Sequence, residues 1–98
     1  MIIRLVKMTF QTEAVDSFLE LFTAENEKIR HFPGCHHLEL WQDETNPTVF
    51  FTHSHWDSLK ALERYRHSPL FDEIWMKTKK GFAARPEAWS VSQRHLSS

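Results

Sequence analysis

The segment from Trp56 to Phe71 constrains the fold more than any other part of the chain. It follows a strand-like run, opens as a helix, breaks at Ser68-Pro69 and then resumes a helical pattern. Serine is a natural helix N-cap, and proline suits the first position of a helix. We therefore expect a strand end and two short helices to meet here, gathering aromatic side chains in a small space suited to a ligand.

The remaining sequence supplies the partners of this segment. Alternating and β-branched runs predict strands at 2–10, 35–41, 48–55 and 87–95, and apolar residues at helical spacing predict helices at 12–31 and 57–81. The expected N-caps are Thr12 for the first helix and Asp57 or Ser54 for the second. The order βαββαβ predicts an α+β fold of the ferredoxin-like kind, a four-stranded antiparallel sheet with helices on one face. With 98 residues there is room for a single domain, 1–98.

Apolar residues occur on both faces of the predicted strands. In the first strand, Ile2 and Val6 lie on one face while Ile3 and Leu5 lie on the other. Helices on one side can cover only one of these faces. The simplest cover for the second face is the same face of another copy, so the sequence predicts a homodimer with two-fold symmetry.

Composition excludes several classes of protein. Twelve basic and thirteen acidic side chains nearly cancel, which argues against a nucleic-acid partner. The first ten residues are too short and too charged for a secretory segment or a membrane span. A single cysteine, Cys35, rules out an internal disulfide framework, so we expect a cytoplasmic protein and an unreactive thiol. Phosphate-loop, dinucleotide and serine-triad motifs are absent from the sequence.

Aromatic residues of the second helical region predict a pocket for a small molecule. Tyr65, together with Trp56, Phe71 and Trp75, can line a space between the helices and the sheet. A planar ring would stack there, and the Tyr65 hydroxyl would hydrogen-bond a phenol or ketone oxygen. The alternative is ordinary core packing at helical spacing.

Two further groups of polar residues have a functional and a plainer interpretation. His53 and His55 point to one face of a strand, and His36, or His37 after a one-residue register shift, could join them to bind zinc, iron or copper. We instead expect these histidines to bond neighbouring groups, with no metal. Basic residues of the second helix could attract an anionic substrate, but a solvated helix face is the commoner arrangement; they are Lys60, Arg64 and Arg66.

Four local features resemble the antibiotic biosynthesis monooxygenase domain of the dimeric α+β barrel superfamily. They are Phe32-Pro33-Gly34-Cys35, Asn46-Pro47, Trp56 and Ser68-Pro69-Leu70-Phe71. Their order and spacing carry the resemblance, which covers almost the whole chain. It implies a dimeric α+β barrel. Members of the family include cofactor-independent quinol or polyketide monooxygenases, haem-degrading oxygenases and isomerases.

The chain departs from the family pattern at three positions. Tyr65 stands where many members have a histidine, and Ser54 stands where the third strand often has a glutamate. Trp75 occupies the place of the iron-binding histidine of the haem-degrading members. Because an indole cannot ligate iron, the resemblance implies weak haem binding at best.

The sequence, with this resemblance, favours a monooxygenase that acts without cofactor on a small aromatic, quinol-like or polyketide-like substrate. Tyr65 and His53 are the expected catalytic residues, which would assist deprotonation. The expected substrate-binding residues are Trp56, Phe71, Trp75 and His55. Three alternatives stay open: an isomerase or lyase of a small oxygenated metabolite, a non-catalytic binding module, and a metal- or haem-dependent oxygenase.

Overall fold

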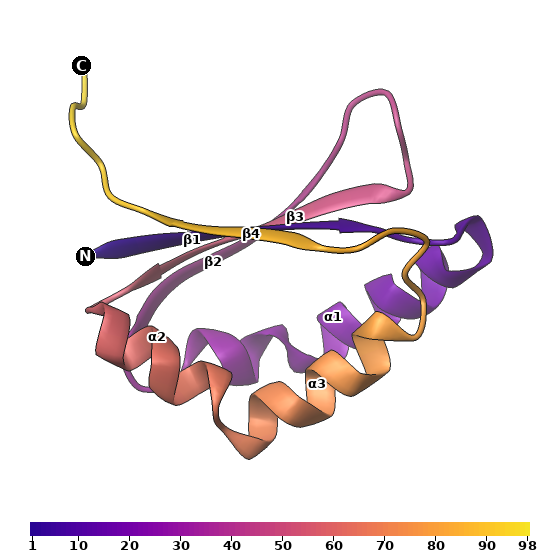
Figure 1. Cartoon of the computed structure of the whole chain (residues 1–98), viewed down its shortest axis with the longest axis horizontal. Helices are drawn as coiled ribbons and strands as arrows, with labels where there is room; N and C mark the ends of the chain where they lie inside the picture. The colour runs from indigo at the N-terminus through magenta and orange to yellow at the C-terminus, as the bar shows by residue number, and fades with distance from the viewer.

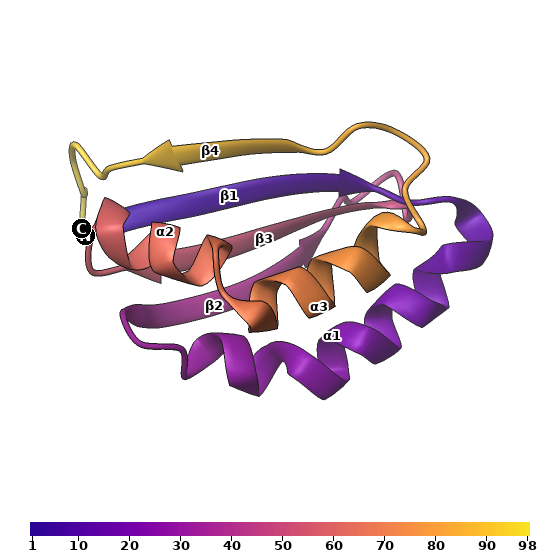
Figure 2. The same ribbon diagram turned by 60° about the horizontal axis from the view of Figure 1, so that its bottom comes forward.

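The computed structural model describes residues 1–98 and confirms the ferredoxin-like α+β architecture (Figure 1). Its elements in chain order are β1 (Ile2–Thr9), the 3₁₀ turn η1 (Thr12–Ala14), α1 (Val15–Arg30), β2 (Cys35–Gln42), β3 (Val49–Trp56), α2 (Leu59–Arg66), α3 (Pro69–Lys79) and β4 (Glu87–Val91). The antiparallel sheet has the order β2-β3-β1-β4. Figure 2 shows all three α-helices on one side of this sheet. None of the helices is long and apolar enough to cross a membrane.

The broken second helical region forms as its sequence predicts. The Ser68 hydroxyl accepts a hydrogen bond from the Phe71 amide, and Pro69 occupies the first turn of α3. The N-cap of α2 is Ser58, whose hydroxyl accepts from the Ala61 amide, so the expected caps Asp57 and Ser54 are wrong.

The start of the first helix and the end of the last strand also differ from expectation. Thr12 opens the 3₁₀ turn and gives no side-chain cap, because α1 begins only at Val15. Strand β4 ends at Val91, which pairs with Ile3, close to the first residue of β1. Beyond Val91 the neighbouring strand offers hardly any backbone to pair with, so the predicted extension to residue 95 does not form.

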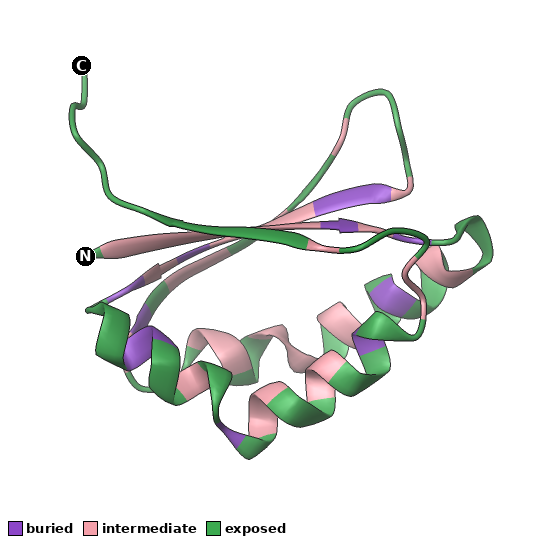
Figure 3. Ribbon diagram, viewed as in Figure 1, coloured by how far each residue is buried: buried purple, intermediate pink, exposed green.

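The core consists of two separate clusters between the helices and the sheet (Figure 3). At one end of the sheet, Phe10 stacks on Phe18 with ring centroids 4.3 Å apart, and Met8 and Phe50 complete the group. The other cluster packs around Trp56 and consists of Cys35, Trp56, Ala61 and Leu62. Between the clusters, the helix-side face of the sheet carries short or polar side chains, which leave space unfilled.

The opposite side of the sheet, which we call the open face, has no cover within the chain. Strand alternation places on it Ile3, Leu5, Lys7, His37, Glu39, Trp41, Phe51, His53, His55, Glu87, Trp89 and Val91. Trp41 and Trp89 are 43% and 44% exposed, far more than a large aromatic ring in a core. The chain therefore presents a second apolar sheet surface to its surroundings.

Candidate functional site

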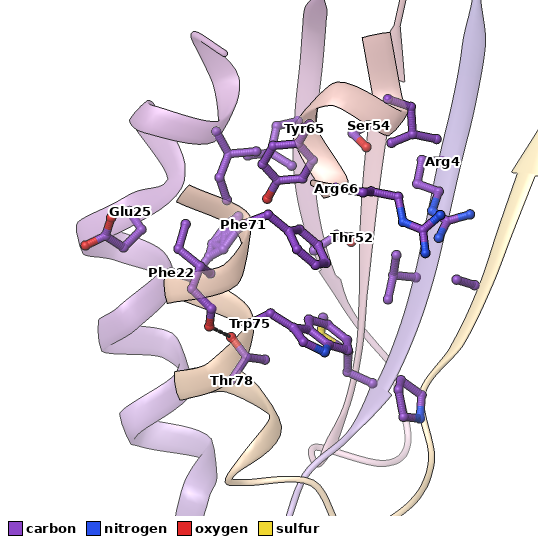
Figure 4. A pocket seen from close by; sticks show the side chains of 18 of the residues that line it. Arg4, Phe22, Glu25, Thr52, Ser54, Tyr65, Arg66, Phe71, Trp75 and Thr78 are labelled. Atoms are coloured by element: carbon purple, nitrogen blue, oxygen red, sulfur yellow. Dashed lines mark hydrogen bonds between the residues drawn. The ribbon is translucent and has the colours of Figure 1, made fainter. Parts of the chain in front are cut away.

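A cavity of about 300 Å³ lies between the three α-helices and the sheet (Figure 4). It is lined by 21 residues, of which 14 are hydrophobic. The sheet contributes Thr52, Ser54 and Ala88, whose short side chains cannot reach the helices. The cavity thus occupies the gap between the two core clusters, and its size is at the lower end of the range for small-molecule sites.

Aromatic rings form one continuous wall of the cavity. Tyr65 stacks on Trp56 with centroids 5.0 Å apart and an interplanar angle of 24°. The edge of Tyr65 meets Phe71 at 5.3 Å, and Phe71 in turn stacks on Trp75 at 5.7 Å. These four residues are the aromatic set that the sequence singled out, and the structure brings all of them to the cavity. Their arrangement offers apolar faces and edges to a planar ligand.

Trp56 is the most deeply buried member of this wall. Its side chain is 1% exposed, and its indole N–H donates a hydrogen bond to the Ser54 hydroxyl over 2.9 Å. The Ser54 hydroxyl thus satisfies a buried donor. Trp56 therefore supports the neighbouring wall residues and offers hardly any surface of its own to a ligand.

The Tyr65 hydroxyl is, beside the Trp75 indole N–H, a polar group of this wall. It makes no hydrogen bond to another group of the chain, and it is not sealed off from the cavity surface. Burial, and secondarily the Cys35 thiol, raises the pKa of Tyr65 well above its usual range. The phenol is therefore neutral at physiological pH and is suited to donate a hydrogen bond.

Two arginines bring positive charge to the same cavity. Arg4 projects from β1 and Arg66 ends α2, and Figure 4 shows their guanidinium groups close together at one side of the space. Arg4 donates to the Ser90 hydroxyl over 3.0 Å, and Arg66 donates to a Glu63 carboxylate oxygen over 2.9 Å. Burial, followed by the nearby charge of Arg66, lowers the pKa of Arg4. An anion between the two groups would relieve this repulsion.

The sequence indicated only part of this arginine pair. Arg66 was expected on a solvated helix face, and it is indeed exposed there, but it also borders the cavity. Arg4 was not singled out, although its position gave a signal: it shares the face of β1 with Ile2, Val6 and Met8. A charged residue on the apolar face of a strand requires a partner or a polar space beneath it.

The histidines lie on the other side of the sheet. His53 and His55 alternate with Thr52, Ser54 and Trp56 along β3, so they point to the open face and are absent from the cavity lining. This placement corrects the expectation that the two histidines contact the same ligand as Tyr65. Because no histidine lines the cavity, the cavity offers no imidazole ligand to a haem iron.

On the open face, three imidazoles and a carboxylate form a compact group. His37 lies opposite His55 and Glu39 lies opposite His53. The hairpin sets this register, because Gln42 pairs with Phe50 and the pairing continues without a shift to His37, so the expected position of His36 opposite His53 is wrong. His36 instead pairs with Asp57.

Hydrogen bonds and burial shift the pKa values of Glu39, His55 and Cys35. Hydrogen bonds from Trp41 and His53 hold the pKa of Glu39 below its usual value, which keeps the carboxylate ionised. Burial, and then the neighbouring imidazoles, lowers the pKa of His55. Burial raises the pKa of the Cys35 thiol, which is therefore protonated near neutral pH.

Comparisons with known proteins agree with this fold. A structure described as an antibiotic biosynthesis monooxygenase superposes with a TM-score of 0.89 at 20% identity, covering 95% of this chain and 98% of the other. A candidate antibiotic biosynthesis monooxygenase from Nitrosomonas europaea gives 0.88 at 15% identity, covering 97% and 100%. A conserved protein of Methanosarcina mazei gives 0.87 at 22% identity, covering 95% and 93%. No curated protein matches the chain by sequence.

The sequence profile of one protein family also matches. The match extends over residues 1–75, which include β1 to β3, α1, α2 and the cavity-lining part of α3 up to Trp75. This span contains the whole aromatic wall and both arginines. The chain belongs to the antibiotic biosynthesis monooxygenase family.

Proposed function

We propose that the chain is a monooxygenase that oxidises a small, acidic aromatic or polyketide-like substrate in this cavity without a bound cofactor. The observation that carries the proposal is the combination of an aromatic wall, an unpartnered Tyr65 hydroxyl and two guanidinium groups around one cavity. The name of the matching family supports the class of reaction.

Binding follows from the composition of the walls. A planar ring would lie against Phe71 and Trp75, with its apolar surface removed from water. An oxygen substituent that ionises, such as a phenol or an enolisable ketone, would point toward Arg4 and Arg66. The substrate class we propose is therefore an aromatic or polyketide-like molecule with an acidic oxygen beside the carbon to be oxidised.

The positive charge would drive the chemistry by stabilising the substrate anion. Two guanidinium groups beside the cavity favour a phenolate or enolate over its neutral form, because a nearby opposite charge stabilises the ionised form. Neither His53 nor Tyr65 serves as the base here, since His53 is on the other face and the Tyr65 phenol is neutral. Water is the proton acceptor in this account.

The anion would then react directly with dioxygen. For a methylene group between activating rings, the carbanion transfers electrons to O₂, and a carbon–oxygen bond forms to give a hydroperoxide. Loss of water from the hydroperoxide leaves a ketone. One oxygen atom enters the product and the other leaves as water, so the substrate supplies all the electrons and no external reductant is needed. Tyr65 would donate its hydrogen bond to the substrate oxygen on which negative charge accumulates.

The test is oxygen uptake by flavin-free, chelator-treated protein with 1,8-dihydroxyanthrone as the probe substrate. We expect uptake above the rate in buffer alone and a strong loss in Arg4→Met and Arg66→Met. The control is Arg64→Met, because Arg64 lies on the same helix but does not line the cavity. Turnover of a probe without oxygen uptake would instead support an isomerase or lyase. Equal uptake by all four proteins would contradict the role given to the arginine pair.

We also propose that the protein acts as a homodimer formed by the open faces of two sheets. An apolar surface that includes Trp41, Phe51 and Trp89 lies uncovered in the single chain. A two-fold pairing would cover it and would exceed about 2,000 Å² of total buried surface, as obligate dimers do. Sedimentation equilibrium at micromolar concentration tests this, and a stable monomer would refute it.

A further inference from the structure

The group of His37, Glu39, His53 and His55 on the open face lies outside the cavity and has no part in the reaction proposed above. One ligand atom from each of His37, Glu39 and His53 lies within 4.8 Å of the others. The three side chains come from adjacent positions of two paired strands, β2 and β3. Their backbones are thus fixed by the sheet and do not depend on a loop.

The distances resemble those around a metal ion. Glu39 Oε1 lies 3.1 Å from His53 Nδ1, and Glu39 Oε2 lies 3.2 Å from His37 Nε2. Two ligands bonded to one zinc ion at about 2.0–2.1 Å, with a tetrahedral angle between them, are roughly 3.4 Å apart. A small rotation of the half-exposed His37 ring would complete three-coordinate binding.

Neighbouring groups hold these side chains in place. The Trp41 indole N–H donates to Glu39 Oε1 over 2.9 Å, and its ring stacks on His53 with centroids 4.7 Å apart. On the far side of the His53 ring, its Nε2 lies 3.2 Å from Nε2 of His55. In the ligating form, the His53 Nε2–H donates to His55 and leaves the Nδ1 lone pair for the metal. Such supporting contacts are typical of histidine ligands to metals.

We propose that His37, Glu39 and His53 bind a divalent first-row transition metal ion, with His55 as the positioning residue for His53. Two imidazoles and a carboxylate suit zinc and its neighbours rather than magnesium or calcium, which prefer oxygen ligands alone. Because the sheet separates this group from the cavity, the ion would stabilise the paired strands and take no part in the oxidation. The proposal departs from the expectation of no metal drawn from sequence alone.

The site also bears on the proposed dimer. If two open faces pair, the ionised Glu39 becomes enclosed, and an enclosed carboxylate is unfavourable without a positive partner. A metal ion ligated by Glu39 would supply that charge. The metal proposal stands without the dimer, however, because all three ligands belong to one chain.

The test is a titration of the untagged, chelator-treated full chain with Zn²⁺ alone, followed by calorimetry and by thermal unfolding. We expect one ion per chain and a rise in the unfolding temperature. His53→Gln and Glu39→Gln should each weaken binding about tenfold or more and abolish the thermal shift. The matched control is His36→Gln, because His36 is next to His37 in sequence but pairs with Asp57.

Each outcome of this titration either supports or overturns the proposed metal site. Circular dichroism establishes that the variants are folded, and His37→Gln replaces any that is not. Failure to bind Zn²⁺, or binding that His53→Gln and Glu39→Gln leave unchanged, would overturn the proposal. Equal weakening by His36→Gln would also overturn it, because it would mean dispersed binding to surface histidines.

Discussion

Replacing Tyr65 by phenylalanine separates the chemical role of this residue from its packing role. The ring rests on Trp56, Phe32 and Phe71 at centroid distances of 5.0, 5.3 and 5.3 Å, and all these contacts survive in Tyr65→Phe. The lost hydroxyl has no partner in the chain, so no hydrogen bond within the protein is broken. A typical intramolecular hydrogen bond contributes about 0.5–1.5 kcal/mol, and none of this applies here.

The expected change in unfolding free energy is therefore within about 0.5 kcal/mol of zero. The turnover rate should respond quite differently. If the hydroxyl stabilises the negative charge that accumulates on the substrate oxygen, its removal should lower the rate roughly 10²–10³-fold. Tyr65→Ala would in addition lose the ring contacts, at a cost of about 3–5 kcal/mol, comparable to the whole stability of a small domain.

The assay pairs urea denaturation with oxygen uptake on 1,8-dihydroxyanthrone. Thr48→Val is the control for loss of a hydroxyl, because the Thr48 hydroxyl bonds Asn46 in the β2–β3 hairpin, away from the cavity. It should leave the rate unchanged. An unchanged rate in Tyr65→Phe would refute the assigned role. A drop in stability that fully accounts for the lost activity would refute it too, since the hydroxyl would then be structural.

Three further outcomes are expected. The unfolded chain loses the Tyr65 proton near pH 10, whereas the folded chain retains it. The free energy of unfolding should therefore fall above that pH by up to about 1.4 kcal/mol per pH unit, and by less in Tyr65→Phe, as urea titrations at pH 9 and 11 will measure. Gly34→Ala should destabilise by about 1–3 kcal/mol, because φ is 94° and a Cβ would lie 2.6 Å from that of Ala61; a loss below about 0.5 kcal/mol in denaturant would contradict this. Haem should bind weakly and without a histidine bond, since no histidine lines the cavity, and a tight histidine-type absorption spectrum in a haem titration would show otherwise.

The fold could be predicted because its signals are local. Each signal spans only a few residues. The signals are the period-two alternation in the strands, the helical spacing in the helices and the Ser68-Pro69 break. The expected cap of α2 was wrong because nearby residues could all serve as caps. Asp57 and Ser54 were the expected caps of α2, whereas Ser58 directly precedes Leu59, the first residue of the helix, and caps it. The end of β4 was wrong because it depends on where the neighbouring strand β1 begins.

The candidate site was predicted only in part, for a related reason. The aromatic wall comes mainly from one contiguous segment, so its members could be recognised together. Arg4 meets Arg66 only through the sheet and helix packing, and a single sequence carries no measure of that proximity. Likewise, the hairpin that pairs Gln42 with Phe50 places His37 opposite His55, and the expected loop at residues 42–47 gave a different register.

The central claim is that a substrate bound in the cavity reduces dioxygen itself. It is tested most directly by mass spectrometry of the product formed under ¹⁸O₂ by chelator-treated, flavin-free protein. We expect one labelled oxygen per oxidised 1,8-dihydroxyanthrone, formed faster than in buffer and lost together with activity in Arg4→Met. Product oxygen drawn from water, or labelled product formed no faster than in buffer, would contradict it.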